Sequence, residues 1–139
     1  MSQPDYYGNP SGITRDGDTV RAIFAAFARR DLDAALEHIA PDCELYLRGT
    51  AHITGRADPY VGHAGVSEYF ADAAKAWDEL LLHADDFRMM PGVVMVLGSV
   101  TARRDGVTAR RSVMWTWRLR DDGKVTSVRV ADAGELRGR

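Results

Sequence analysis

The sequence predicts an α+β domain in which three N-terminal helices pack on a strongly curved antiparallel or mixed sheet. Apolar residues recur at intervals of three and four in the first half of the chain, which is the period of a helix. In the second half they alternate with polar residues, which is the period of a strand, and glycine-containing pairs separate the alternating runs. Helices followed by hairpin-linked strands are typical of the α+β class.

Three helices are expected, the first two preceded by side chains that can cap them. Asp18 or Thr19 precedes the first helix, and Asp31 precedes a short second helix that Pro41 ends. The third helix is expected from about His63 to Glu79. The inner faces of the first and third helices are expected to consist of Val20, Ile23, Phe24, Phe27, Val66, Tyr69 or Phe70, Ala73 and Trp77.

The strands follow from alternation and from the turns between them. A first strand is expected at 43–48, with Leu45 and Leu47 on one face, and residues 49–62 read as a long loop of the kind that often closes over a site. The turn pairs Pro91-Gly92, Asp105-Gly106 and Asp122-Gly123 then separate strands at 81–90, 93–103, 107–120 and 125–132.

Composition is that of one globular domain. The chain has 139 residues, of which 45% are hydrophobic and 27% charged, and we place the domain at 18–133, an arm at 1–17 and a charged tail at 134–139. The net charge of −2 gives no general attraction for nucleic acid. No apolar run is long enough to span a membrane, and the N-terminus lacks the pattern of a signal peptide, so we expect a cytoplasmic protein.

Strand alternation gives the sheet two faces of different character. The polar face is expected to carry Ser99, Thr101, Arg103, Arg110, Ser112, Thr116 and Arg118. The apolar face is expected to carry Val100, Ala102, Val113, Trp115, Trp117, Leu119, Val128 and Val130. The apolar face must meet the helices, so the polar face lies outside, where it contacts either solvent or a second copy of the chain in a homodimer.

Asp132 breaks the apolar pattern, because it continues the inward series of Val128 and Val130. A carboxylate on an apolar face is costly unless it is paired or functional, so Asp132 is a candidate catalytic acid or base. The alternative is that the strand ends at Ala131 and that Asp132 caps it or forms an ion pair at the rim. Arg111 also falls on the inner series, and we expect it to extend to water rather than to pair with an acid.

His83 is a second catalytic candidate, as a general base on the strand after the third helix. The two tryptophans of the long strand form either plain core or a flat wall for a ring-shaped ligand. The candidate ligand-binding residues are Trp115, Trp117, Tyr46, Tyr60, Trp77, Phe27 and Val130. The four histidines have no metal-binding spacing and no cofactor motif is present, so we expect neither a metal nor a cofactor.

Three motifs in this order resemble the nuclear transport factor 2-like (NTF2-like) superfamily, and within it the SnoaL-like and ketosteroid-isomerase-like proteins. The first comprises residues 23–27 (IFAAF), 31–36 (DLDAAL) and 40–42 (APD); the second is 60–66 (YVGHAGV) with Tyr69-Phe70; the third is 117–125 (WRLRDDGKV) with 130–132 (VAD). The resemblance implies a cone, an α+β barrel-like shape whose bent sheet wraps around the helices and leaves one pocket open at the wide end. It also implies a small hydrophobic ligand and frequent dimers.

The resemblance also places the polar groups of ketosteroid isomerase at four positions, which are apolar in this chain: Ile23, Leu47, Phe70 and Trp115. This argues against ketosteroid isomerisation by that mechanism. The aspartate–arginine–aspartate set of limonene-epoxide hydrolases would have only Asp132, and scytalone-dehydratase-like chemistry would depend on His52, His83, Tyr46 and Tyr60.

Three functions therefore stay open. The first is an enzyme of isomerase, cyclase, dehydratase or hydrolase type acting on a hydrophobic or polycyclic molecule, with Asp132 as acid or base. The second is a binding protein without catalysis, and the third is a structural module whose pocket is filled by its own side chains.

Overall fold

The computed structural model describes residues 10–132, so residues 1–9 of the expected arm and the expected tail at 134–139 lie outside the described residues. The elements are α1 (Pro10–Ala28), α2 (Leu32–Leu36), β1 (Ile39–Tyr46), α3 (Arg48–Thr54), β2 (Tyr60–Val61), α4 (Gly62–Ala76), β3 (Glu79–Met90), β4 (Val93–Arg104), β5 (Val107–Leu119) and β6 (Val125–Asp132). The order of helices followed by hairpin-linked strands confirms the expected α+β class.

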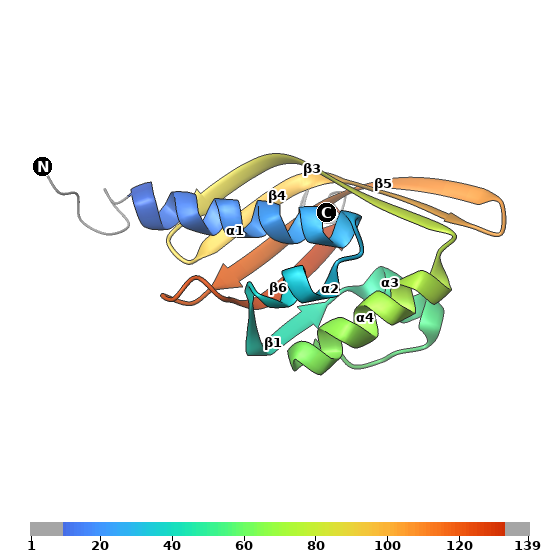
Figure 1. Ribbon diagram of the computed structural model, residues 1–139. Helices are drawn as coiled ribbons and strands as arrows, with labels where there is room; N and C mark the ends of the chain where they lie inside the picture. Colours follow the sequence, from blue (N-terminus) through green and yellow to red (C-terminus); the bar gives the residue numbers. More distant parts are fainter. Residues whose placement is uncertain (1–9, 133–139) are drawn as a thin grey trace, which may run out of the picture.

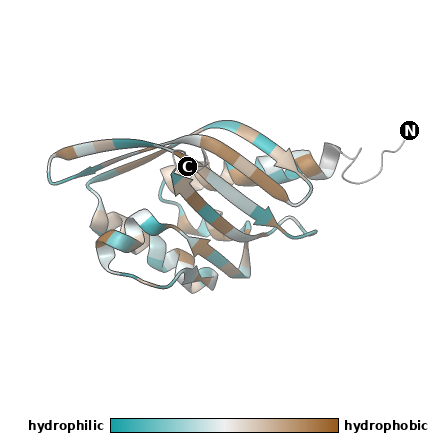
Figure 2. Cartoon of the chain, turned by 180° about the vertical axis from the view of Figure 1, so that it is seen from behind, coloured by the Kyte–Doolittle hydropathy of each residue, from teal (hydrophilic) through white to brown (hydrophobic). Residues whose placement is uncertain are grey.

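The strands form one six-stranded sheet in the order β2-β1-β6-β5-β4-β3. Neighbours are antiparallel except β1 and β6, which run parallel. The sheet is strongly curved but not closed into a barrel, and α1 lies along its concave side (Figure 1). Figure 2 shows hydrophobic and hydrophilic residues alternating along the strands, as the sequence predicted.

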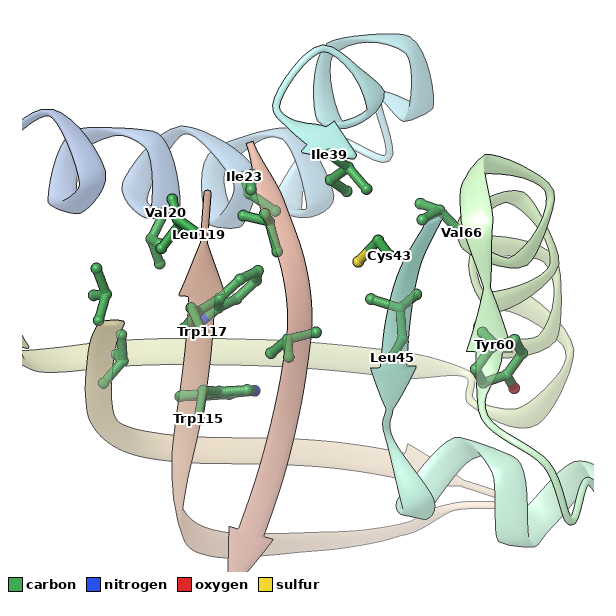
Figure 3. Packing of buried hydrophobic residues seen from close by; sticks show 14 of the residues in the cluster. Val20, Ile23, Ile39, Cys43, Leu45, Tyr60, Val66, Trp115, Trp117 and Leu119 are labelled. Atoms are coloured by element: carbon green, nitrogen blue, oxygen red, sulfur yellow. The ribbon is translucent and has the colours of Figure 1, made fainter. Parts of the chain in front are cut away.

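The core lies between α1 and the concave face of the sheet. Trp115 and Trp117 project from the same face of β5 (Figure 3) and are 3% and 6% exposed. The Phe24 ring of α1 meets both indoles edge-on, at centroid distances of 5.0 and 5.4 Å. Such aromatic pairs contribute about 0.5–1.5 kcal/mol each beyond the apolar area they bury, so they fix α1 on the sheet.

Helix α1 begins at Pro10, well before the expected start at Asp18. Gly17 lets this first part of the helix lie close to β3, because a Cβ at this position would overlap Sδ of Met89. Asp16 is buried beside Arg15, whose Nη2 lies 3.1 Å from Asp16 Oδ1. Residues 10–17 are thus helical rather than part of an arm, held by packing that a local capping pattern does not reveal.

The start of the second helix, the hairpin between β4 and β5 and the last strand agree closely with the sequence. The end of the second helix does not, because α2 ends at Leu36 and Pro41 lies within β1. Asp31 caps α2 by accepting a hydrogen bond from the Ala34 N–H at 3.1 Å. Asp105 and Gly106 have φ values of 53° and 79°, the left-handed conformations that a tight hairpin turn requires. Strand β6 has the bounds that alternation predicted, 125–132.

The expected loop at 49–62 is wrong, since this segment contains most of α3 and all of β2. Gly49, Thr50 and Thr54 are poor helix formers, so local propensity does not predict α3. Tertiary packing stabilises it instead, because Thr50 is 5% exposed and is hydrogen-bonded to Trp77. Gly55, with φ of 78°, ends α3 in a left-handed conformation.

Candidate functional site

A cavity of about 720 Å³ lies between the concave face of the sheet and the helices. Its lining is predominantly apolar and aromatic. The sheet contributes Leu45, Leu80, Leu82, Val100, Ala102, Val113, Trp115, Trp117, Val128 and Val130. The helices α1, α3 and α4 contribute Ile23, Phe24, Phe27, Thr50, Ile53, Val66, Tyr69 and Phe70.

Five of the seven candidate ligand-binding residues line this cavity: Trp115, Trp117, Trp77, Phe27 and Val130. They come from α1, β5, β6 and the C-terminal end of α4, so the fold gathers residues that are far apart in the sequence. The inward-facing series predicted by alternation accounts for the three strand residues. Their contact with a ligand stays a prediction.

Tyr46 and Tyr60 do not line the cavity. Tyr46 alternates with Leu45 and Leu47, which face inward, so its side chain lies on the outer side. There its hydroxyl donates to Glu44 Oε1 at 2.7 Å, which raises the Tyr46 pKa, and the Arg129 guanidinium lies 3.7 Å from its ring centroid. Tyr46 therefore belongs to a surface cluster with Glu44 and Arg129.

Tyr60 is fully buried in the core between β2 and α4 (Figure 3). Its hydroxyl donates to Asp72 Oδ2 at 2.9 Å. Burial is the larger cause, and the Asp72 carboxylate the smaller one, of a Tyr60 pKa raised to about 12. The sequence placed Tyr60 in the expected loop at 49–62 as a candidate ligand-binding residue, but its hydroxyl bonds to Asp72 of α4.

His83 also lies outside the cavity. On β3 the residues that line the cavity are Leu80 and Leu82, so strand alternation turns His83 to the opposite face, where it pairs in register with Ser99 of β4. His83, which the sequence offered as a candidate general base, therefore faces away from the cavity.

Asp132 does line the cavity, at its exposed margin, and its side chain is 37% exposed. Arg111 Nη1 lies 2.9 Å from Asp132 Oδ2, although the Arg111 side chain is otherwise 71% exposed. The expectation that Arg111 would extend to water without an acidic partner is thus wrong. Both interpretations of Asp132 are met in part. Strand β6 continues through Asp132, as the inward series predicted, but Asp132 also forms an ion pair at the rim, as the alternative predicted.

Helix α3 supplies lining residues that the loop prediction missed. Arg48 and His52 are exposed and line the cavity, as Arg111 and Asp132 do, whereas Thr50 is buried. Thr50 Oγ1 accepts a hydrogen bond from Trp77 Nε1 at 3.0 Å. The margin thus carries charged and titratable groups around an apolar interior.

Tyr69 of α4 adds a polar atom to the apolar interior. Its ring stacks on Phe27 at 5.7 Å between centroids and meets Tyr60 edge-on at 5.4 Å. Burial raises the Tyr69 pKa to about 12, an effect that Thr50 partly opposes. Helical periodicity placed Tyr69 or Phe70 on the inner face of this helix, and both line the cavity.

The four positions at which ketosteroid isomerases carry polar groups all line the cavity: Ile23, Leu47, Phe70 and Trp115. The resemblance therefore identified true lining positions. Because all four side chains are apolar, the cavity lacks the donors and the base of that mechanism at those positions. Within residues 10–132, no three histidine, cysteine or acidic side chains lie together as a metal site would require.

A curved mixed sheet that encloses a cavity with its helices defines this chain as an NTF2-like protein. More specifically, it belongs to the SnoaL-like domain family, whose model matches residues 20–128. No curated protein matches the chain. Among the described helices, none is both long enough and apolar enough to cross a membrane.

Solved structures agree with this assignment. An NTF2-like protein of unknown function from Burkholderia pseudomallei is 25% identical, with a TM-score of 0.76 over 88% of this chain and 95% of that one. TerC, co-crystallized with polyporic acid, has the same identity, TM-score and coverage. RV0760c from Mycobacterium tuberculosis, in complex with estradiol-17beta-hemisuccinate, is 16% identical, with a TM-score of 0.68 over 84% and 92% of the chains.

Proposed function

We propose that this protein binds a flat hydrophobic small molecule in the cavity between sheet and helices. The observation that carries the proposal is the cavity itself, about 720 Å³ with an aromatic and aliphatic lining. Ligand pockets of roughly 300–1,000 Å³ with such linings are typical of small-molecule sites. A module filled by its own side chains would leave no space of this size, so this alternative is disfavoured.

The structural neighbours support the same class of ligand. TerC was co-crystallized with polyporic acid, and RV0760c was crystallized in complex with estradiol-17beta-hemisuccinate. Both compounds are built on rings and carry acidic groups. In this chain a ring system would lie against Trp115 and Trp117, and its polar end would face the margin formed by Arg48, His52, Arg111 and Asp132.

A matched pair of variants tests the binding site. Val100 lines the cavity, whereas Thr101, the next residue of β4, faces the other side of the sheet. We expect Val100→Phe to reduce the affinity for the naphthalene-sulfonate dye ANS at least tenfold by filling the cavity, and Thr101→Phe to leave it within about twofold. Equal affinities for the two variants would place the dye elsewhere and count against the proposal.

Acid–base catalysis at Asp132 is a second candidate, favoured by one observation. The carboxylate reaches the cavity and is held by Arg111 at 2.9 Å, so it is positioned beside a bound molecule. A positioned carboxylate can transfer a proton to or from a ligand, as isomerases, cyclases, dehydratases and hydrolases require.

The Asp132→Asn variant distinguishes ligand binding from catalysis. We expect it to retain its affinity for a panel of polycyclic ketones while losing incorporation of solvent deuterium next to the carbonyl, measured by mass spectrometry. Deuterium incorporation that is equal in wild type and variant would exclude Asp132 as the base and leave the binding function alone.

A homodimer through the outer face of the sheet is part of the proposal. This face carries the expected polar residues together with Met95, Leu97 and Met114, which alternate with the inward series. We expect light scattering to give twice the mass of one chain, and Met114→Glu to shift the mass toward that of one chain. A wild-type mass equal to one chain would contradict this part.

A further inference from the structure

The exposed residues of the cavity lining lie in two segments of the chain. Among the described residues that line the cavity, Arg48, Gly49, His52, Ala109 and Arg111 are exposed, and the others are half-buried or buried. The first three belong to α3, and the last two belong to the first half of β5. Figure 1 shows α3 and the hairpin between β4 and β5 at the same end of the molecule. The exposed margin of the cavity is therefore bounded by α3 and by this part of β5.

This margin is predominantly basic, because it carries Arg48, His52 and Arg111. Arg48 and His52 are four positions apart on α3, which places them on the same side of the helix. Within residues 10–132, Asp132 is the only acidic residue of the lining, and it shares its carboxylate with Arg111 at 2.9 Å. Two arginines and one carboxylate give the described lining a net positive charge, even when His52 is neutral.

The walls behind the margin strengthen the effect of this charge. The interior is lined by aliphatic and aromatic side chains, which form a medium of lower dielectric constant than water. A cleft with such walls and one predominant sign of charge concentrates the electric field and attracts ligands of the opposite sign. The basic side chains also supply hydrogen bonds: a guanidinium presents N–H donors in a planar fork that matches a carboxylate, and an imidazole ring donates in either protonation state.

We propose that the ligand of this cavity is an organic anion, a flat hydrophobic molecule with a carboxylate or similar acidic group, and that Arg48, His52 and Arg111 bind this group at the margin. Asp132 reduces the attraction, because it is the one negative charge beside it, but it does not reverse the sign. This inference rests on the proposed binding function, because it requires a ligand in the same cavity.

The orientation of the ligand follows from the cost of burying charge. A carboxylate that enters an apolar interior loses its hydration, and this cost is large unless the charge is paired. The ring system, in contrast, gains from burial against Trp115 and Trp117. The rings therefore occupy the interior, and the acidic group stays at the margin, where water and the three basic side chains surround it.

The test compares naphthoic acid with naphthamide, which share one ring system and differ in charge at neutral pH. Isothermal titration calorimetry measures the affinity of the full chain for each probe. We expect the wild type to bind the acid about three- to tenfold more tightly at low salt, because ionised groups form stronger hydrogen bonds than neutral ones but exposed ion pairs are weakened by water. This preference should decrease at high salt, since ions screen exposed charges.

Arg48→Gln and Arg110→Gln form a matched pair of variants. Each removes one positive charge from an exposed arginine, but Arg110, which precedes Arg111 on β5, does not line the cavity. We expect Arg48→Gln to lower the preference for the acid at least about twofold and to leave the affinity for naphthamide unchanged, whereas Arg110→Gln should keep the preference. Arg48→Lys, which retains the charge, should keep most of it.

The outcomes distinguish this inference from the proposed function. If the wild type binds both probes equally, if naphthoic acid does not bind a chain that binds ANS, or if Arg110→Gln lowers the preference as much as Arg48→Gln, the anion site is refuted while the binding function stands. If neither probe binds and Val100→Phe leaves the ANS affinity unchanged, the binding function fails, and the anion site fails with it.

Discussion

Arg111 Nη1 and Asp132 Oδ2 lie 2.9 Å apart at the exposed margin of the cavity. Val113 of β5 is the register partner of Asp132 on β6, so Arg111, two residues earlier on the same face, is its diagonal neighbour. Diagonal neighbours are within reach of long side chains. The arrangement places one positive and one negative group at the exposed edge of the cavity, and it gives this margin a polarity that the apolar interior lacks.

The Asp132→Ala variant tests what this ion pair contributes. Since both partners are more than one-third exposed, we expect the free energy of unfolding to change by less than about 1 kcal/mol. Removing the carboxylate frees the Arg111 guanidinium, so affinity for the anionic dye ANS should rise a few-fold at low salt. Unfolding in urea and dye titrations measure the two effects, and a rise that persists at high salt would argue against an electrostatic cause.

Gly98→Ala is expected to distort the sheet next to the cavity. A Cβ at position 98 would overlap the His83 carbonyl oxygen and lie 3.2 Å from the Trp115 ring. Because the obstacle is backbone beside the bulge between Ala84 and Asp86, the strand must shift, and we expect a loss of about 1–3 kcal/mol in unfolding free energy.

Gly12→Ala is the control for this substitution. Nothing lies within 4 Å of a Cβ at Gly12, which is in α1. Alanine is the better helix former, so stability should stay unchanged or rise by up to about 1 kcal/mol. A similar loss at both glycines would mean that crowding at Gly98 is not the cause.

Alkaline pH should destabilise the fold through Cys43. Burial raises the pKa of this thiol from 9.0 to about 12, with smaller effects of Asp42 and Glu44. Above about pH 9 the unfolded chain therefore loses a proton that the folded chain keeps, so stability is complete below pH 9 and falls as the pH rises toward 12. Tyr60 and Tyr69, whose pKa values are raised to about 12, act in the same direction above pH 10.

Urea unfolding at about pH 8 and about pH 11, followed by tryptophan emission, measures this loss. In the Cys43→Ala variant the difference between the two pH values should be smaller than in wild type. An identical difference would mean that the thiol ionises equally in both states. The protonated thiol should also resist thiol reagents at neutral pH until the chain unfolds.

Thr50→Val should weaken the packing of α3 on α4. The buried indole N–H of Trp77 would lose its acceptor, and we expect a cost of about 1–3 kcal/mol in unfolding free energy. Thr54→Val in the same helix is the control, since its hydroxyl donates to the backbone carbonyls of Thr50 and Ala51 and its loss leaves no buried indole N–H without an acceptor, and it should cost less than about 0.5 kcal/mol. Equal costs would assign the effect to helix propensity.

Strand alternation was sufficient to predict most of the sheet wall. Trp115, Trp117 and Val130 face the cavity as expected, because the period of a strand fixes the face of every residue once one is known. The same rule turns His83 away, because Leu80 and Leu82 on its strand face inward. Asp132 was found as the one carboxylate in an inward series.

The part of the cavity wall that α3 forms was harder to predict than the parts formed by α1 and α4, because α3 depends on contacts between distant segments. Local propensity does not predict a helix at Arg48–Thr54. This helix is held by the hydrogen bond that Thr50 accepts from the Trp77 indole, 27 residues away in the sequence. The partner of Arg111 likewise lies on another strand. The left-handed Gly55 at the end of α3 is a local signal that could have indicated the helix.

Tryptophan fluorescence during a titration with ANS tests the central claim most directly. All three tryptophans of the chain, Trp77, Trp115 and Trp117, line the cavity, so a dye bound there must quench their emission by energy transfer. We expect tryptophan emission to fall in parallel with the rise in dye emission and to saturate at one dye per chain. A rise in dye emission with unchanged tryptophan emission would show that the dye binds elsewhere, and would contradict a small-molecule site in this cavity.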